Sequence, residues 1–168
     1  MSESGIELPL EDGMRIAHEF LSQAKLYKGS TIVGSIRRHR PVVHDIDIIL
    51  DVSLNCFAQT MCDGPVHLPR KRIEVLKWGQ KLAAVRFQGV PIDLYFSTLE
   101  TLYTLLLIRT GSKENNIRLA TIAKRRGWKL HASGDGLFNE RGERIAGDSE
   151  RSIYDALGVP WQEPWERG

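Results

Sequence analysis

The chain has 168 residues, of which 42% are hydrophobic and 26% are charged, and its formal net charge is +2. This composition is typical of a globular protein with one ordinary domain or two small subdomains, and it argues against a disordered chain. The small net charge excludes a protein that coats nucleic acid through the field of the whole molecule, so any such contact must come from local basic patches.

The N-terminal sequence and the two cysteines are typical of a protein that resides inside the cell. The sequence has no apolar run long enough to span a bilayer, and "MSESGIELPLEDG" has neither the basic start nor the apolar core of a secretory signal. The two cysteines, Cys56 and Cys62, have no paired histidines nearby, which favours free thiols over a zinc site. We therefore expect a soluble, cytoplasmic protein that does not bind a membrane.

Periodicity over the first 97 residues predicts a helix followed by several strands. Residues 11–26 have the apolar spacing of an amphipathic helix, and "TIVGS" reads as a short strand that ends at Gly34. In "DIDIILDV", residues 45–52, apolar and acidic side chains alternate as in a half-buried strand. A loop or short helix is expected over 53–70, and further strands are expected at "RIEVLKW", "LAAVRF" and "VPIDLYF".

The composition changes near Ser97, where helical spacing replaces strand alternation. An apolar helical stripe precedes "TGS", and its members are Leu99, Leu102, Tyr103, Leu106 and Leu107. A second helix is expected over about 113–126, with Gly127 ending it, followed by a glycine-rich pair of short strands and a serine-capped helix in "SERSIYDALG". The predicted fold class is α+β: a mixed β-sheet with helices on one side over residues 1–97, and a small α+β subdomain over 98–168.

Three aspartates stand within predicted strands. Asp45 and Asp47 are two residues apart, so their side chains point the same way, and Asp93 interrupts another apolar strand. Neighbouring carboxylates repel one another unless a cation keeps them ionised, and hard divalent ions such as Mg²⁺ take oxygen ligands. The alternative for the aspartate pair alone is a solvated acidic strand face, and for Asp93 an edge-strand acid with a lysine partner. If the two strands are neighbours, the three carboxylates could hold two metal ions about 3.5–4 Å apart.

The segment "GSIRR" carries the complementary charge. A strand that turns into a helix at Gly34 exposes backbone N–H groups that bind anions. Ser35 adds a hydroxyl, and Arg38 or Arg37 can grip phosphate oxygens with two hydrogen bonds. Gly-Ser alone would be an ordinary turn, but in front of an aspartate pair it favours a site for a phosphate and a metal.

This pattern of G-S-x-x-R, D-x-D and a distant strand aspartate resembles the palm of the polymerase beta nucleotidyltransferase superfamily. The segments "TGSKENNIRLATIAKRRGWKL", "GLF" and "ERIAGDSERSIYDALGVPWQEP" are similar to the thumb of family X DNA polymerases. The resemblance runs from about residue 10 to the C-terminus and implies a minimal palm-plus-thumb form, with the palm over 1–97 and the thumb over 98–168. A separate N-terminal lyase domain, which the family often carries, is not expected, and neither is lyase activity.

The resemblance also implies roles for individual residues. Asp45, Asp47 and Asp93 would be catalytic and bind two Mg²⁺ ions, with Mn²⁺ as a possible substitute, and Asp93 would help to deprotonate the primer 3′-OH. Other residues would bind the incoming deoxynucleoside triphosphate, through its phosphates, sugar or base; they are Gly34, Ser35, Arg38, Gly111, Ser112, Lys113 and Asn116.

Two positions depart from the family pattern. Ile108 and Arg109 stand where the family commonly has an aromatic pair under the sugar, so we predict measurable insertion of ribonucleotides. His44 replaces the small residue that often precedes the aspartate pair, and it either packs locally or approaches the triphosphate.

Basic side chains near the end of the second predicted helix are candidate DNA contacts. The residues are Arg118, Lys124 and Arg125, although cations at a helix C-terminus are also explained by the helix dipole. A second basic group, "RHR" at 38–40 with "PRKR" at 69–72, is a candidate for contact with the DNA backbone. Binding through such patches should weaken as salt is added.

We therefore predict a monomeric, template-directed DNA polymerase that acts on gapped or primer–template DNA, filling short gaps in DNA repair. The alternative is a minimal, template-independent nucleotidyltransferase that modifies RNA, protein or a small molecule. A non-catalytic DNA-binding module is less consistent with the sequence, because three converging carboxylates without a metal would repel DNA.

Overall fold

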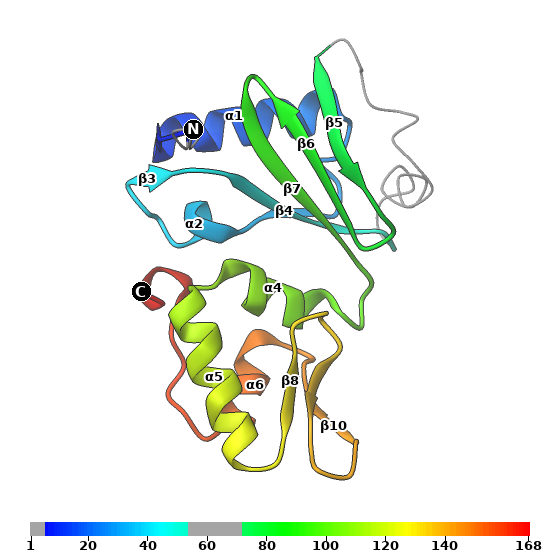
Figure 1. Ribbon diagram of the computed structural model, residues 1–168, viewed down its shortest axis with the longest axis vertical. Helices are drawn as coiled ribbons and strands as arrows, with labels where there is room; N and C mark the ends of the chain where they lie inside the picture. The colour runs from blue at the N-terminus through cyan, green and yellow to red at the C-terminus, as the bar shows by residue number, and fades with distance from the viewer. Residues whose placement is uncertain (1–5, 54–71) are drawn as a thin grey trace, which may run out of the picture. The chain divides into compact units, whose positions relative to one another are not determined.

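The structure is a computed structural model that describes residues 6–53 and 72–168 (Figure 1). The chain has two compact units, residues 1–96 and 97–168, which we call the first and the second unit. The predicted loop over 53–70, both cysteines and most of the "PRKR" group lie outside the described residues. In the described ranges, no helix is both long and apolar enough to cross a membrane.

The first unit is built on a five-stranded sheet in which each strand was predicted from the sequence. The order across the sheet is β2 (Ser30–Ile32), β4 (Ile46–Asp51), β7 (Val90–Ser97), β6 (Leu82–Phe87) and β5 (Ile73–Trp78). The pairs β2–β4, β6–β7 and β5–β6 are antiparallel. The order makes β4 and β7 neighbours, although a long stretch of chain separates them.

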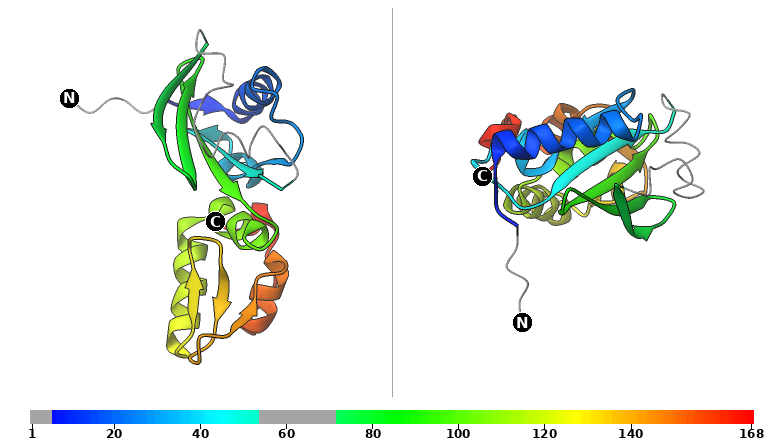
Figure 2. Two further views of the ribbon diagram at one scale, coloured as in Figure 1. Left: turned by 90° about the vertical axis from the view of Figure 1, so that its right-hand side faces the viewer. Right: turned by 90° about the horizontal axis from the view of Figure 1, so that it is seen from above.

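One face of this sheet is covered by helix α1 (Leu10–Gln23), with the short helix α2 (Gly34–Arg37) in the same apolar core (Figures 1 and 2). Alternate residues of the central strands enter that core; they are Ile46, Ile48 and Leu50 from β4 and Ile92, Leu94 and Phe96 from β7. Because side chains alternate along a strand, Asp47, Asp93 and Tyr95 are on the opposite face. Helix α1 ends earlier than predicted, since Lys25 adopts a left-handed φ of 56°.

A second, two-stranded sheet joins β1 (Leu8–Pro9) to β3 (Val42–Val43). Nearby, His44 Nδ1 lies 2.9 Å from the carbonyl oxygen of Ile6, a local contact that agrees with the packing alternative for this histidine. These contacts hold the backbone that leads directly into Asp45. Strands of two residues carry too little periodicity to be predicted from a sequence.

The second unit combines three helices with a small antiparallel sheet. The helices are α4 (Leu102–Thr110), α5 (Lys113–Arg125) and α6 (Glu150–Ala156), followed by a 3₁₀ turn, η1 (Pro164–Glu166). The sheet order is β10 (Arg144–Ala146), β9 (Gly136–Phe138) and β8 (Lys129–His131), so the predicted pair of strands is a set of three. The core of this unit includes Leu107, Leu119, Leu137, Ile153, Tyr154 and Leu157.

Local signals in the second unit were largely correct. Ser112 caps α5 by accepting a hydrogen bond from the Asn115 N–H (3.2 Å), and Ser149 caps α6 by accepting one from the Ser152 N–H (3.0 Å). Gly127 has the predicted left-handed conformation after α5, with φ 73°. Leu99, however, precedes α4 and is 63% exposed, so its place in the apolar stripe was wrong.

Candidate active site

Asp47 and Asp93 meet at the hydroxyl group of Tyr95. The Tyr95 oxygen lies 3.2 Å from Asp47 Oδ1 and 3.3 Å from Asp93 Oδ2. Asp93 and Tyr95 are two residues apart on β7 and so point the same way, whereas Asp47 comes from the neighbouring strand β4. The sheet order thus brings together two carboxylates that the sequence could only suggest were close.

Asp45 lies just before β4 and is exposed, two positions ahead of Asp47. Within the described ranges, no three histidine, cysteine or acidic side chains are gathered into a ready metal cluster. The structure therefore assembles a pair of half-buried carboxylates, with the third predicted aspartate on the adjoining stretch of chain.

The Gly-Ser turn lies against Asp47. The Val33 N–H donates a hydrogen bond to the backbone carbonyl of Asp47 (2.8 Å). Gly34 has φ 63°, and a Cβ atom at this position would collide with Asp47 Oδ2, so only glycine fits. The turn that was predicted to bind phosphate is thereby fixed beside one of the predicted metal ligands.

Two further residues of the predicted phosphate site follow that glycine. Ser35 is the second residue of α2, and its buried hydroxyl oxygen has no hydrogen-bond partner in the part of the chain that the structure describes. Arg38 comes directly after α2, one residue beyond its last turn. A buried hydroxyl without a partner is unfavourable, and the oxygen of a bound phosphate is one group that could satisfy it.

The chemistry of these donors fits a hard divalent cation. Carboxylate oxygens are the ligands that Mg²⁺ prefers, and it commonly binds one or two of them together with phosphate oxygens of a substrate. Asp47 and Asp93 supply such oxygens from two rigid strands, next to the turn that carries Ser35. Charge also favours this arrangement, because a cation between two carboxylates removes their mutual repulsion.

In the second unit, the residues predicted to contact the sugar and base lie at the turn between α4 and α5. Gly111 has φ 74° and links the two helices, and Lys113 is exposed at the first position of α5. The amide nitrogen of Asn116 donates a hydrogen bond to the Ile108 carbonyl (2.7 Å), while its Oδ1 atom is buried without a partner in the described ranges. Asn116 therefore links α5 to the last turn of α4, and its contact with a base stays a prediction.

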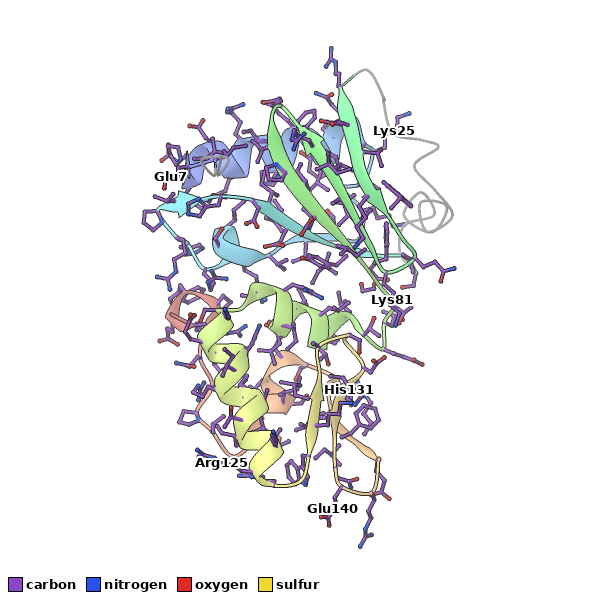
Figure 3. The ribbon with its side chains drawn as sticks, viewed as in Figure 1. Glu7, Lys25, Lys81, Arg125, His131 and Glu140 are labelled. Carbon is purple, nitrogen blue, oxygen red and sulfur yellow. The ribbon has the colours of Figure 1, made fainter. Side chains whose placement is uncertain are left out.

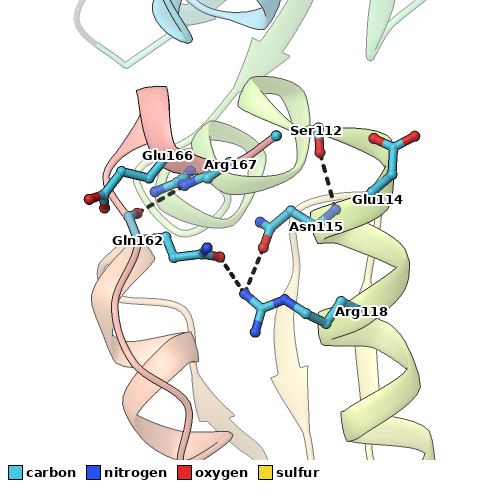
Figure 4. Close-up of a pocket in the computed structure, with 8 residues that line it drawn as sticks. Ser112, Glu114, Asn115, Arg118, Gln162, Glu166 and Arg167 are labelled. Atoms are coloured by element: carbon cyan, nitrogen blue, oxygen red, sulfur yellow. Dashed lines mark hydrogen bonds between the residues drawn. The ribbon is translucent and has the colours of Figure 1, made fainter.

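The predicted DNA contacts differ in their surroundings. Arg118 is half-buried, and its guanidinium donates hydrogen bonds to Asn115 Oδ1 (2.9 Å) and Gln162 Oε1 (2.5 Å), which ties α5 to the C-terminal segment (Figure 4). Lys124 and Arg125 are exposed in the last turn of α5, where Arg125 is labelled in Figure 3. Within the described ranges Lys124 and Arg125 make no side-chain hydrogen bond, whereas both bonds of Arg118 come from its Nη2 atom and leave its other N–H groups available. Contact of all three residues with DNA stays a prediction.

Tyr95 was not identified from the sequence as a residue of the site. Its position two residues after Asp93 on the same strand face was the available signal, since residues i and i+2 of a strand are neighbours. Aromatic residues are common in strands for packing reasons alone, so the sequence did not distinguish a polar role from an apolar one.

Three comparisons with known proteins agree on the relationships of this chain. Residues 105–168 match the family described as DNA polymerase beta thumb. The chain is 30% identical over 157 residues to the DNA polymerase/3′-5′ exonuclease PolX of Bacillus subtilis, covering 90% of this chain and 27% of that protein. It therefore spans about a quarter of the length of that curated relative.

The fold comparison extends over both units. The crystal structure of Leishmania infantum polymerase beta in a ternary P/T complex is similar with a TM-score of 0.73 and 18% identity, over 97% of this chain and 77% of that one. At this identity the likeness establishes the fold, which is α+β as predicted. The thumb segment, the similarity to PolX and the fold thus all relate this chain to the family X DNA polymerases.

Proposed function

We propose that this chain is a template-directed DNA polymerase that adds a deoxynucleotide to a primer 3′-OH, filling short gaps during DNA repair. The main support is the meeting of Asp47 and Asp93 beside the Gly34 turn, which combines carboxylates with a potential phosphate site on rigid elements. The similarity of the chain to family X polymerases supports two substrates for this site: gapped or primer–template DNA, and deoxynucleoside triphosphates.

The proposed reaction forms a bond between the primer 3′ oxygen and the α-phosphorus of the nucleotide, and it breaks the bond from that phosphorus to pyrophosphate. Asp93 accepts the proton of the 3′-OH. Asp45 and Asp47 would hold two Mg²⁺ ions, and Asp93 would hold the catalytic one of the two, with Mn²⁺ as a possible substitute. When bound, these cations supply charge neutralisation at the attacking and leaving oxygens. Ser35 and Arg38 hold the phosphates that leave, so most of the catalysis comes from positioning and electrostatics.

Residues of the second unit have proposed roles of their own. The turn at Gly111 and Ser112 contacts the sugar, and Lys113 and Asn116 lie near the base. Lys124 and Arg125 bind DNA phosphates. We propose that the protein acts as a monomer.

A labelled-primer extension assay on gapped, recessed and template-free DNA tests this function, with each of the four nucleotides offered separately. We expect addition of the nucleotide that the template specifies, and no extension by Asp93→Asn, since an amide neither accepts the proton nor carries the charge. Asp12→Asn is the matched control, because Asp12 lies in the first turn of α1 with its side chain 49% exposed and paired with Arg15.

Both variants should melt at the temperature of the wild type, which separates catalysis from folding. Template-independent addition by the wild type would instead support the nucleotidyltransferase alternative. Undiminished extension by Asp93→Asn would remove the proposed mechanism.

A further inference from the structure

The hydroxyl of Tyr95 contacts both carboxylates of the candidate site. Its oxygen lies 3.2 Å from Asp47 Oδ1 and 3.3 Å from Asp93 Oδ2. A phenol carries one proton, so it cannot make a full hydrogen bond to each carboxylate at once. Both distances exceed the roughly 2.5–2.7 Å of a strong O–H···O⁻ bond, which indicates that the one proton is shared between the two acids.

The phenol is held in place by the sheet. Tyr95 is only 8% exposed, and it is the sixth residue of the eight-residue strand β7, which pairs with β6 on one side and adjoins β4 on the other. A side chain buried in a packed strand has little rotational freedom, so its hydroxyl is a fixed point. Asp47 and Asp93 are half-exposed, so the hydroxyl approaches them from the buried side of the site.

The two oxygens of Asp47 have different surroundings. Oδ1 faces the Tyr95 hydroxyl, whereas Oδ2 lies against Gly34, one residue before Ser35. The hydrogen bond to Tyr95 therefore orients the carboxylate so that its other oxygen is directed toward the Gly-Ser turn. Loss of this bond would remove one of the contacts that fix that orientation.

We propose that Tyr95 is a positioning residue that holds Asp47 and Asp93 together for a divalent cation, an inference that rests on the proposed function. Removal of the phenol takes away a hydroxyl that contacts both carboxylates, whose negative charges repel each other. Hydrogen-bond partners of metal ligands typically contribute about 10–100-fold to metal affinity. Since one proton is shared over two long bonds, we expect an effect of about tenfold, at the lower end of that range.

The test compares Tyr95→Phe with Tyr27→Phe. Tyr27 is a matched control in the same unit, because its hydroxyl donates to the His18 carbonyl (2.9 Å) and the residue is 54% exposed. Binding of Mn²⁺ to each protein alone, without DNA or nucleotide, is measured by electron paramagnetic resonance. Phenylalanine has the shape of tyrosine, and thermal unfolding of each variant confirms that it is folded.

We expect Tyr95→Phe to bind Mn²⁺ about tenfold more weakly than the wild type, and Tyr27→Phe to bind it equally well. In primer extension, Tyr95→Phe should need about tenfold more Mg²⁺ for half of its maximal rate, with most of that rate recovered at saturating Mg²⁺. A purely structural role would not produce this separation of metal affinity from maximal rate.

Equal or tighter Mn²⁺ binding by Tyr95→Phe, beside normal binding and extension by the wild type, would overturn the inference and leave the polymerase function standing. A wild type that neither binds Mn²⁺ nor extends a primer would overturn both.

Discussion

The carboxylate of Asp47 occupies the space that any side chain on Gly34 would need. Gly34 has φ 63°, and its missing Cβ atom would overlap Asp47 Oδ2. The glycine is therefore required twice, once for its backbone conformation and once for its small size. This close approach joins the predicted phosphate turn to the predicted metal ligand.

Gly34→Ala should accordingly displace Asp47 and lower the extension rate by about 100-fold, since a shift of about 1 Å at a catalytic group has such an effect. Gly89→Ala is the matched control: Gly89 has φ 83°, but a Cβ atom there would meet open space. Each variant should lose about 1–2 kcal/mol of stability from the left-handed backbone. Single-turnover extension and denaturant unfolding measure the two effects, and equal activity of the two variants would contradict the steric explanation.

Lys124→Ala combined with Arg125→Ala should weaken DNA binding and make it less sensitive to salt. Each phosphate contact contributes about 0.9 to the slope of log K against log salt, so the loss of two contacts should reduce that slope by about two. Titration of labelled gapped DNA at several salt concentrations gives the slope.

Arg118→Ala is the informative comparison for that experiment. Its guanidinium is bound to Asn115 and Gln162, so its removal should lower the melting temperature and leave the salt slope unchanged. A reduced slope for Arg118→Ala would instead support a direct contact between this residue and DNA.

Ribonucleotide insertion should be measurable, because Ile108 and Arg109 replace the aromatic pair that the family commonly places under the sugar. Ile108→Tyr should improve the preference for deoxynucleotides by about tenfold, the lower part of the range that one packing contact can supply. The ratio of kcat/KM for the two nucleotide types measures this preference. Ile145→Tyr, on β10, serves as the control, and a strict deoxynucleotide preference of the wild type would refute the idea.

The ion pair between Arg167 and Glu150 should stabilise the second unit far more than an exposed pair of the same length. Arg167 donates to Glu150 Oε1 at 2.8 Å with its side chain fully buried, and it lies 4.9 Å from the centre of the Trp161 ring. Arg167→Met leaves the carboxylate of Glu150 without this partner inside the unit, at a cost of about 3–5 kcal/mol.

The matched control is Arg86→Met, which breaks an exposed pair with Glu74 of nearly equal length, 2.9 Å. That change should cost no more than about 1 kcal/mol, because solvent screens the pair and the side chains are mobile. Denaturant unfolding compares the two variants, and similar losses would show that burial is not the deciding factor.

The fold could be predicted well where the signal is local. Alternation of apolar and acidic residues predicted β4, because side chains of a strand point to opposite faces. A glycine predicted the end of α5, and a serine cap with a following glycine predicted the limits of α6. The paired strands β1 and β3 were missed, since two residues carry no period, and the last sheet was expected to have two strands and has three.

The candidate site was predictable only in its residue types. Asp45, Asp47 and Asp93 were recognised because charged side chains are rarely placed within apolar strands unless a partner or a ligand compensates their charge. The contact of Arg118 with a DNA phosphate stays a prediction, but its hydrogen bond to Gln162, 44 positions further along the chain, was not foreseen. Such a partner cannot be inferred from local periodicity.

The sequence by itself determined which faces of the strands are apolar, where α5 ends, where α6 begins and ends, and which acids lie within apolar strands. Only the tertiary structure decided that β4 and β7 are neighbours and that Tyr95 reaches Asp47 across 48 positions of the chain. The physical reason is that the period of a strand determines which of its faces is apolar but not which strands lie beside it. Those neighbours depend on the packing of the whole sheet.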